Sequence, residues 1–363
     1  MAIAVIFGGK SCEHDVSVIT GIQALAEIEK LKPVPIYIDR SGNWFTGRMH
    51  SVGDVRNTRV LKKVYMRPGS NRLYTQLGRT AAVIDAAVLC CHGVNGEDGT
   101  LQGFLELCGV AYTGSDVYAS ALCMDKARFK RFASAEGFAQ VPYTDFTRAE
   151  FNTDIYSVAD KLNAVGYPFM IKPSRQGSSI GIGKAANEKE LVARVRTALA
   201  YDDTVIAEKL LSGFREFNCA AVSDGKTLTV SEVEEPVGWK DFLSYDDKYA
   251  GKKAVRRKFP ASIDETLRNR IRKETEKIFR AAGLGGVARV DFMLGDDGTL
   301  YLNEVNTLPG SLASYFFVGR EMSVEGFYEK LLSDAQLRRA ARDRLVYKYR
   351  SPLGKGMKGN CPR

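Results

Sequence analysis

Apolar runs alternate with amphipathic stretches in the first third of the chain, which predicts alternating strands and helices. The run IAVIFG (3–8) has the continuous apolar pattern of a buried strand, and apolar residues recur at helical spacing over residues 16–26. Further buried strands are predicted at residues 34–39 and 82–93. Strands that alternate with helices are typical of a doubly wound parallel α/β domain.

Glu13 lies between the first predicted strand and the first predicted helix. Ligands of doubly wound sheets bind beyond the carboxyl ends of the strands, so this position favours a role in substrate binding. A carboxylate in the first turn of a helix is also stabilised by the helix dipole, and a purely structural role stays open. His92, which follows a predicted strand, is expected to be a structural hydrogen-bond donor rather than a catalyst.

A β-hairpin is predicted near the C-terminus from two β-rich segments, GVARVDFML (286–294) and TLYLNEVNT (299–307). They are joined through Asp-Gly, a strong turn signal. A two- or four-residue loop centred on Asp296-Asp297 would pair Asp291 with Leu302. Because side chains alternate between faces, a slip by one residue would change which of them share a face. In the predicted register four polar side chains share one face: Arg289, Asp291, Glu304 and Asn306.

Two carboxylates and an amide oxygen on one rigid face suit a hard cation. Mg²⁺ prefers oxygen ligands and commonly bridges protein carboxylates to substrate phosphates. The same residues could instead form the exposed polar face of an ordinary hairpin, with Arg289 and Asp291 in a salt bridge. The hairpin alone leaves both interpretations open, and phosphate-binding features upstream favour the metal site.

A glycine- and serine-rich loop in the middle of the chain has the character of a phosphate-binding loop. It follows the predicted strand PFMIK (168–172) and contains Gly177, Ser178 and Ser179. Consecutive backbone N–H groups and hydroxyls suit a triphosphate, although this is not a Walker A loop, since GxxxxGK[ST] is absent. Lys172 would neutralise phosphate charge, or else extend along the surface as an ordinary lysine. In a further predicted strand (204–217), backbone groups could face a purine and carboxylates a ribose.

The composition, 45% hydrophobic and 26% charged residues, is that of a globular protein in water. The 363 residues suffice for two or three domains. Neither a signal peptide nor a membrane-spanning run of ~20 apolar residues is expected. Seven cysteines without metal-site or redox spacing predict reduced thiols in a cytoplasmic protein.

The net charge of +9 is concentrated at the C-terminus. Residues 338–363 contain nine Lys or Arg and one Asp, a net of +8, so the rest of the chain carries only +1. A near-neutral body with a basic tail is unlike a uniformly basic nucleic-acid-binding protein. Residues 338–350 are expected to form a short helix, and residues 351–363 to be largely disordered.

Eight short motifs in one order resemble those of the D-alanine–D-alanine ligases of the ATP-grasp superfamily, over roughly residues 1–333. Each alone would be a weak match, but eight in order are highly specific. They are GGKSCEHDVS (8–17), HGVNGEDGTLQG (92–103), MDK (124–126), KPSRQGSSIG (172–181), EKLLSGFRE (208–216), YDDKY (245–249), ARVDF (288–292) and NEVNTLPGSL (303–312).

The resemblance implies a fold of mixed class, α/β followed by α+β. An N-terminal doubly wound α/β domain (1–116) would help bind the first amino acid. Central (117–207) and C-terminal (208–333) ATP-grasp domains would hold ATP, with residues 233–262 as a lid over the site. A basic tail (334–363), partly disordered, lies outside the resemblance.

The activity that the resemblance implies is ADP-forming ligation of two D-alanine molecules through an acyl phosphate, to supply the dipeptide for peptidoglycan synthesis. D-alanine and ATP would be the partners, with two Mg²⁺ ions (or Mn²⁺), and the protein would be a cytoplasmic homodimer that binds no specific nucleic acid. D-serine is an alternative acceptor, and D-lactate is less favoured because of the YDDKY motif. A tail-driven protein that binds anionic surfaces is the alternative outside enzymology.

The resemblance also assigns roles to residues. Nucleotide-binding positions are Lys126, Lys172, Ser179, Glu208, Lys209, Leu211, Glu216 and Lys248. Metal ligands are Asp291, Glu304 and Asn306. Residues expected at the reacting groups are Glu13, Ser178, Tyr249, Arg289 and Ser311, with Glu13 on the ammonium of the first D-alanine and linked to Ser178 and Tyr249. Ser311 and Leu312 would approach the carboxylate of the second D-alanine.

Overall fold

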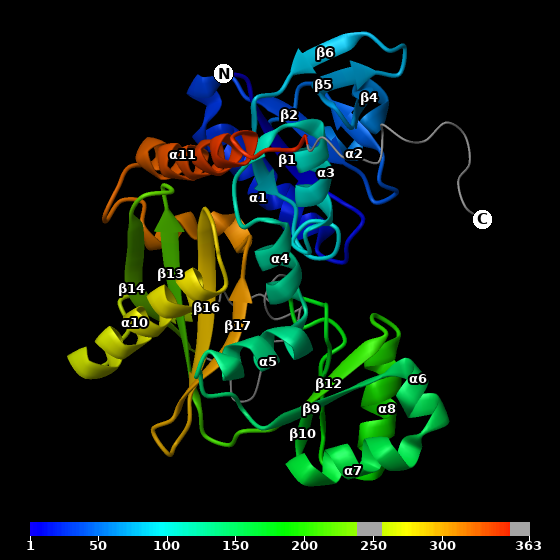
Figure 1. Ribbon diagram of the computed structural model, residues 1–363, viewed down its shortest axis with the longest axis vertical. Helices are drawn as coiled ribbons and strands as arrows, with labels where there is room; N and C mark the ends of the chain where they lie inside the picture. The colour runs from blue at the N-terminus through cyan, green and yellow to red at the C-terminus, as the bar shows by residue number, and fades with distance from the viewer. Residues whose placement is uncertain (238–255, 349–363) are drawn as a thin grey trace, which may run out of the picture.

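Strand β1 (Ile3–Gly8) lies at the centre of the N-terminal sheet in the computed structural model, which describes residues 1–237 and 256–348. The strand order is β6-β5-β4-β3-β2-β1-β7-β8, in which β2, β1, β7 and β8 are parallel and β3 to β6 extend the sheet as antiparallel strands (Figure 1). The other elements are α1 (His14–Glu27), η1 (Glu29–Leu31), β2 (Val34–Ile38), β3 (Trp44–Thr46), α2 (Val52–Arg56), η2 (Thr58–Val60), β4 (Lys62–Arg67), β5 (Ser70–Thr75), β6 (Thr80–Val83), β7 (Ala86–Cys90), α3 (Thr100–Cys108) and β8 (Ala111–Tyr112).

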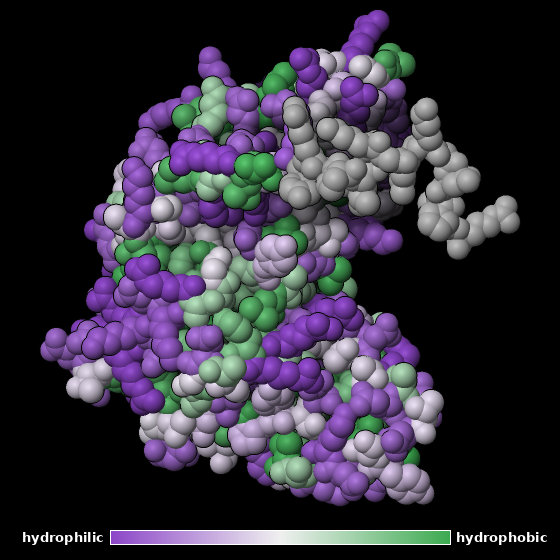
Figure 2. All heavy atoms as spheres, in the orientation of Figure 1, coloured by the Kyte–Doolittle hydropathy of each residue, from purple (hydrophilic) through white to green (hydrophobic). Residues whose placement is uncertain are grey.

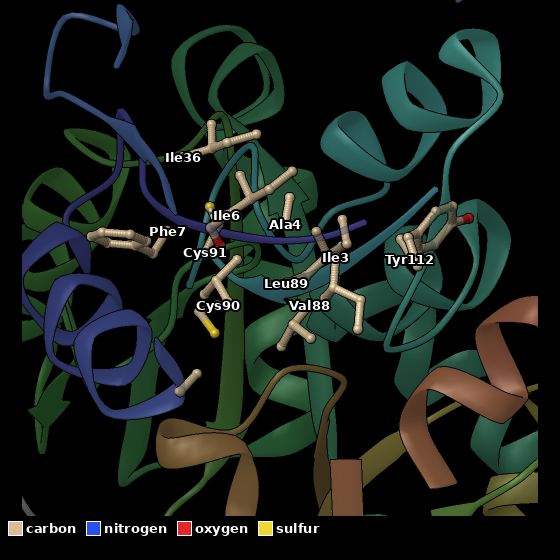
Figure 3. Close-up of a cluster of buried hydrophobic side chains, with 14 of the residues drawn as sticks. Ile3, Ala4, Ile6, Phe7, Ile36, Val88, Leu89, Cys90, Cys91 and Tyr112 are labelled. Carbon is tan, nitrogen blue, oxygen red and sulfur yellow. Dashed lines mark hydrogen bonds between the residues drawn. The ribbon is translucent and has the colours of Figure 1, made fainter. Parts of the chain in front are cut away.

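The core of this domain forms around β1, in which every residue is buried. Figure 3 shows Ile3 and Ile6 of β1 beside Val88 and Leu89 of β7. Full burial of one such side chain contributes about 1.5–3 kcal/mol to folding. Helix α1 lies close against β1 because Gly21 has no side chain: a β-carbon there would be 2.2 Å from the Phe7 ring. This packing fixes the start of α1, and Glu13 with it, at the carboxyl end of β1.

The predicted α/β class is confirmed, but the sheet is mixed rather than wholly parallel. The antiparallel strands β3 to β6 were not predicted. In β4 only Val64 and Met66 are buried, and basic residues flank them, so the strand lacks the continuous apolar run by which β1 was predicted. The strand predicted at 82–93 is also shorter, because β7 covers only Ala86–Cys90.

The central domain contains a four-stranded antiparallel sheet in the order β11-β10-β12-β9. Helices α7 and α8 pack on it, with Val158 and Val195 in the same buried cluster as Phe169 of β10. The elements of this part of the chain are α4 (Val117–Met124), α5 (Lys126–Ala135), β9 (Tyr143–Thr147), α6 (Arg148–Thr153), α7 (Ile155–Val165), β10 (Phe169–Pro173), β11 (Gly183–Ala185), α8 (Glu188–Leu199) and β12 (Thr204–Lys209). Of these, α4 and α5 pack in the core of the C-terminal sheet.

The C-terminal domain contains a five-stranded antiparallel sheet in the order β15-β14-β13-β16-β17. Helix α10 covers it and buries Ile271 and Ile278 (Figure 1). On the face shown in Figure 2, hydrophilic side chains cover α10, and hydrophobic ones gather near the middle, around α4. The elements are β13 (Arg215–Ser223), β14 (Leu228–Val237), β15 (Arg256–Lys258), α10 (Glu265–Ala281), β16 (Val287–Leu294), β17 (Leu300–Asn306), η3 (Gly310–Phe316) and α11 (Val324–Asp343).

The predicted hairpin is β16-β17, and it has the predicted polar face through a different register. Its loop is Asp296–Gly298, because the Gly295 N–H donates to the Thr299 carbonyl at 3.0 Å, and Gly298 has the positive φ of +75° that such a turn needs. This loop of three residues is one residue longer than the shorter predicted loop and one residue shorter than the longer one. The pairing is therefore shifted by one residue near the turn.

A β-bulge shifts the register by one further residue, with Asn303 as the extra residue between Leu302 and Glu304. Asp291 therefore lies opposite Glu304, and the predicted pairing of Asp291 with Leu302 is wrong. Two one-residue shifts restore the original parity, so the four polar side chains do share a face. The bulge has a signature in the sequence: the buried positions of β17 are Leu300, Leu302 and Val305, and the alternation breaks at Asn303.

The expected lid and tail differ in part from the structure. Residues 233–237 belong to β14 and residues 256–258 to β15, so both ends of the expected lid are paired strands. Helix α11 continues to Asp343, across the expected boundary at 333. The predicted helix over 338–350 is therefore confirmed only for residues 338–343, and Leu345 and Val346 lie beyond its end and are exposed. Residues 238–255 and 349–363 lie outside the described part of the chain.

Two further expectations concern the whole chain. Six of the cysteines lie in the described ranges, and all six are free thiols. Within residues 1–237 and 256–348, the structure has no helix with the length and apolar character needed to span a bilayer.

Candidate active site

Two adjoining cavities lie where the three domains meet. The first, of about 240 Å³, is lined by residues of all three domains, among them Glu13, Ser178 and Arg289. The second, of about 150 Å³, lies between the central and C-terminal sheets and is lined by Lys172 and Glu208. Several residues line both cavities and therefore mark the border between them: Lys126, Gly177, Ser178, Glu216, Asn218, Asp291 and Glu304.

The polar face of the hairpin forms this border. Arg289 donates two hydrogen bonds to Asp291, Nε to Oδ1 and NH2 to Oδ2, both at 2.7 Å. Asn306 donates to the same carboxylate through Nδ2 at 3.1 Å. Glu304 lies 3.4 Å from the ammonium of Lys126. The Arg289–Asp291 salt bridge of the structural alternative thus exists, but it lies on a cavity wall and not on an open surface.

The loop after β10 has the exposed backbone that was predicted for it. Ser178 and Ser179 are consecutive residues with left-handed φ values of 51° and 60°. Such a conformation is costly for residues other than glycine and is concentrated at functional sites. Gly177 is required for close approach, since a β-carbon there would lie 2.6 Å from Oε2 of Glu13. Lys126 fastens the loop by donating to the Gln176 carbonyl at 2.7 Å.

The structure brings Glu13 to this loop. Ser178 Oγ donates a hydrogen bond to Oε1 of Glu13, which joins the N-terminal domain to the central domain across the first cavity. Glu13 precedes α1 and makes no side-chain hydrogen bond to the first turn of that helix. Its carboxylate therefore contributes to the cavity and does not cap the helix.

Glu208 is buried between two lysines. Lys172 Nζ lies 2.6 Å from Oε2 and Lys130 Nζ lies 3.1 Å from Oε1. Burial alone would raise the pKa of Glu208, but the two ammonium groups outweigh it and lower that pKa to about 2. Glu208 is therefore an ionised, acceptor-only group at the wall of the second cavity.

Three other predicted nucleotide-binding residues lie at the second cavity with different orientations. Leu211 and Glu216 line it. Lys209 also lines it, but its ammonium donates to the carbonyls of Gly166, at 3.2 Å, and Tyr167. The structure thus ties the Lys209 side chain to the loop before β10.

The loop that follows β17 lines the first cavity from Thr307 to Gly310. Ser311, Leu312 and Ala313 have φ values of 50°, 50° and 49°, a left-handed turn that costs roughly 1–2 kcal/mol per residue. Gly310 lines the cavity, whereas the Ser311 backbone N–H donates to Oγ1 of Thr20 at 3.2 Å. The strained turn is held by hydrogen bonds from the N-terminal domain.

His92 also holds the loop after β17, through Leu308 and Thr20. Its Nδ1 lies 2.8 Å from the Leu308 carbonyl, which only accepts, so Nδ1 carries the proton. Nε2 then accepts from the Thr20 hydroxyl at 2.9 Å. Burial lowers the pKa of His92 to about 4, which keeps the ring neutral at pH 7. The expected structural role of His92 as a hydrogen-bond donor is confirmed.

Glu97 also holds this loop, from the HGVNGEDG segment. It accepts from the backbone N–H groups of Gly93 at 2.7 Å and Leu308 at 3.1 Å. Burial, followed by the charge of Glu13, raises its pKa above the ordinary range. The N-terminal domain therefore anchors the loop after β17 through both a neutral histidine and a carboxyl group.

Sequence reasoning missed three residues of the site and assigned two that are not described. Lys130, Glu97 and Thr20 had no assigned role. The signal for Lys130 was available: it lies four residues after Lys126 on α5, between the buried Phe129 and Ala133, where a solvated lysine is not expected. Lys248 and Tyr249 lie outside the described residues.

Comparisons with known proteins agree with this geometry. Family profiles described as D-ala D-ala ligase N-terminus and C-terminus match residues 2–115 and 132–333. A D-alanine–D-alanine ligase from Thermosipho melanesiensis is 37% identical over 87% of this chain and 88% of its own, and one from Staphylococcus epidermidis is 34% identical over 86% and 87%.

Solved structures of similar fold include a D-Ala:D-Ser ligase from Enterococcus faecalis, with a TM-score of 0.79 and 32% identity over 92% of this chain and 99% of that one. A D-alanine–D-alanine ligase from Coxiella burnetii has a TM-score of 0.80 over 95% and 96% of the two chains, at 22% identity, and so supports the fold alone.

Proposed function

Because this chain belongs to the D-alanine–D-alanine ligase family, we propose that it joins two D-alanine molecules at the expense of ATP and supplies the dipeptide for peptidoglycan synthesis. The observation that carries the proposal is the shared border of the two cavities. Lys126, Asp291 and Glu304 lie on it, between a cavity lined by Glu208 and Lys172 and a cavity lined by Glu13 and Arg289. A phosphoryl group can pass from nucleotide to amino acid only across such a border.

The reaction has two steps, and both need positive groups that stabilise developing negative charge. A carboxylate oxygen of the first D-alanine attacks the γ-phosphorus of ATP, which forms an acyl phosphate and releases ADP. The amine of the second D-alanine then attacks the acyl carbon, which forms the peptide bond, releases phosphate and gives up a proton. Negative charge develops on phosphoryl or tetrahedral oxygens in both steps, so positioned cations provide most of the catalysis.

Residues of the first cavity are assigned to the amino acids. Glu13, held by Ser178, would bind the ammonium of the first D-alanine. Arg289 points its guanidinium at Asp291 on the border and would stabilise charge on the transferring groups. Ser311 and Leu312, in the loop anchored by Thr20, would approach the carboxylate of the second D-alanine. The roles of Lys248 and Tyr249 remain predictions, since the structure does not describe them.

Residues of the second cavity are assigned to ATP. Glu208 would accept from the exocyclic amine of adenine, and Glu216 would bind the ribose. The remaining contacts of the nucleotide are assigned to these residues: Lys126, Lys172, Ser179, Lys209 and Leu211.

The donor set on the border fits Mg²⁺. Asp291 and Glu304 lie opposite each other with Asn306 beside them, and all three are partly exposed to the cavity. Carboxylate and amide oxygens are the ligands that Mg²⁺ prefers, and this set offers both kinds. When bound, magnesium (two ions, or Mn²⁺) would supply charge neutralisation for the phosphates. We assign Asp291, Glu304 and Asn306 as the residues that would hold it.

D-serine is the alternative acceptor, because a D-Ala:D-Ser ligase is among the similar solved structures. The tail-driven binding of anionic surfaces has no comparable support. A homodimer in the cytoplasm remains the expected context of the enzyme.

The test is phosphate release from ATP by the purified full-length protein with D-alanine alone, and with D-serine or D-lactate added, together with identification of the dipeptide. We expect release with D-alanine alone. A protein that forms ADP only when D-serine is present would support the alternative, and one that forms no ADP with either would contradict the proposal.

A further inference from the structure

Lys130 is a buried charge to which the proposed reaction gives no task. Its side chain, on α5, is only 1% exposed. Its polar contacts are Oε1 of Glu208 at 3.1 Å and Oε1 of Gln140 at 3.2 Å, and its ammonium also lies 5.6 Å from the centre of the Tyr143 ring. Burial of an ammonium is costly unless it is paired, so a lysine here needs a reason that an apolar residue could not satisfy.

The two lysines beside Glu208 differ in access. Lys172 pairs with Oε2 at 2.6 Å, is 12% exposed and lines the nucleotide cavity. Lys130 pairs with the other oxygen, Oε1, and is not among the described residues that line either of the two cavities. A ligand in the cavity can therefore reach Lys172 directly, whereas Lys130 can contact it only through Glu208.

We propose that Lys130 is a positioning residue, which keeps Glu208 paired and ionised while the ammonium of Lys172 turns from Glu208 to the phosphates of the nucleotide. The inference rests on the proposed function, because it takes ATP as the ligand of the second cavity. One ammonium cannot neutralise both a buried carboxylate and a phosphate at full strength. Without Lys130, Glu208 would either retain Lys172 or become an unpaired buried carboxylate and take up a proton.

The consequence is selectivity for an aminopurine. An ionised carboxylate only accepts hydrogen bonds, so Glu208 fits the exocyclic N–H donor of adenine and opposes the ring carbonyl oxygen of guanine. A protonated Glu208 could donate to that oxygen. Lys130 thus determines a property of the nucleotide site without touching the nucleotide.

The experiment compares Lys130→Met, which keeps the length of the chain and removes the charge, with Lys130→Arg, which keeps the charge. Lys277→Met is the matched control: Lys277 also contacts a ring, with its ammonium 4.2 Å from the centre of Phe138, and donates to the Glu136 carbonyl, away from both cavities. For each protein, KM for ATP and kcat are measured at saturating D-alanine, and ADP and GDP binding are measured by calorimetry.

For Lys130→Met we expect KM for ATP to rise at least about tenfold, kcat to fall less than about threefold, and the ADP-to-GDP preference to shrink by about tenfold, since a tenfold change corresponds to loss of a single charge-assisted hydrogen bond. Lys130→Arg and Lys277→Met should stay within about threefold of the unaltered protein. Adding Glu208→Gln to Lys130→Met should recover part of the ATP affinity, because no unpaired carboxylate remains.

Several outcomes would overturn the proposal. They are unchanged KM and ADP-to-GDP preference in Lys130→Met, equal losses for all nucleotides with no recovery in the double variant, or failure of both Lys130 variants to fold. The proposed function is judged separately: if the unaltered protein binds ADP but forms no dipeptide, that function fails, while the calorimetric comparison still tests Lys130.

Discussion

One wall of the nucleotide cavity and one loop of the amino-acid cavity are held by different kinds of interaction. The wall of the nucleotide cavity is organised by full charges, with Glu208 between Lys172 and Lys130. The loop at the amino-acid cavity is held by directed hydrogen bonds among neutral groups, from the Leu308 carbonyl through His92 to Thr20. Charge pairs tolerate movement of one partner, as the turn of Lys172 toward phosphate requires. Directed hydrogen bonds weaken when one partner moves, so they are suited to holding a strained turn in one conformation.

Substitutions at the border between the cavities should reduce activity most, because its residues line both the nucleotide cavity and the amino-acid cavity. Glu304→Gln keeps the shape of the side chain and removes one charge opposite Asp291. We expect kcat to fall on the order of 10²–10³-fold, the effect of losing one preorganised electrostatic contact to the transition state. The melting temperature without ATP should not change, since the apolar face of the hairpin is untouched.

The control is Asp297→Asn, the same exchange at the turn of the same hairpin, where the carboxylate accepts from Thr299 and Tyr301 outside the cavities. Loss of activity in Glu304→Gln together with a lower melting temperature would favour the structural interpretation of the hairpin.

Acidification should affect the neutral network selectively. Burial lowers the pKa of His92 to about 4 in the folded protein, below its ordinary 6.5, so the unfolded state binds the proton more tightly. The contribution of the neutral His92 to the free energy of unfolding is therefore fully present above pH 6.5. It is lost as the pH falls from 6.5 towards 4, by up to about 3 kcal/mol at 1.36 kcal/mol per pKa unit. The measurement is urea unfolding from pH 4.5 to 7.5.

His92→Asn serves as the reference, because its amide can still donate to the Leu308 carbonyl but does not titrate. Glu97 titrates in both proteins, so the difference between the two stability curves isolates the imidazole. Parallel curves would show that His92 is not the group that responds to acid.

Thr20→Val tests whether binding of the second D-alanine can be weakened without a change in ATP binding. Valine has nearly the same shape as threonine, but it neither donates to His92 nor accepts the Ser311 N–H. We expect KM for the second D-alanine to rise about five- to tenfold, corresponding to about 1–1.4 kcal/mol for the lost hydrogen bond to the Ser311 N–H, the one of the two that holds the turn directly. KM for ATP should stay within about twofold. A rise in KM for ATP of equal size would mean that the cavities are not organised independently.

The sequence predicted the parts of this site whose chemistry is local. The polar face of β16-β17 and the exposed backbone at Ser178 and Ser179 follow from patterns within a few residues. The Asn303 bulge was missed although the alternation of buried positions breaks there. The face was nevertheless correct, because the shift at the loop and the shift at the bulge cancel in parity. Lys130 and Thr20 escaped because each acts through a partner distant in the sequence.

The C-terminal boundary failed for a related reason. Residues 338–343 were grouped with the basic tail by charge, but they continue α11, which lies between the core of the N-terminal sheet and the strand ends of the C-terminal sheet (Figure 1). Arg338 donates to Asp334 at 2.7 Å and to the Gly114 carbonyl at 2.6 Å, and Asp334 accepts from the Gly286 N–H at 2.9 Å. A basic residue that joins the N-terminal and C-terminal domains cannot be distinguished from a solvated one by its charge alone.

The smallest effect is expected from removal of the charges beyond Lys348. A chain that ends after Lys348 lacks Arg350, Lys355, Lys358 and Arg363 but keeps Arg338 and Arg342, which contact the folded body. Neither cavity of the described structure is lined by residues beyond Tyr315, so we expect D-alanine and ATP kinetics within about a factor of three, a change in barrier below roughly 0.7 kcal/mol. The same truncation should weaken any salt-sensitive binding to anionic vesicles, because four positive charges are lost. The measurements are steady-state kinetics and vesicle binding at two salt concentrations for both chains. If the truncated protein folded but lost turnover, residues 349–363 would be needed for catalysis, as the border residues are. The expectation that both cavities work without this segment would then be wrong.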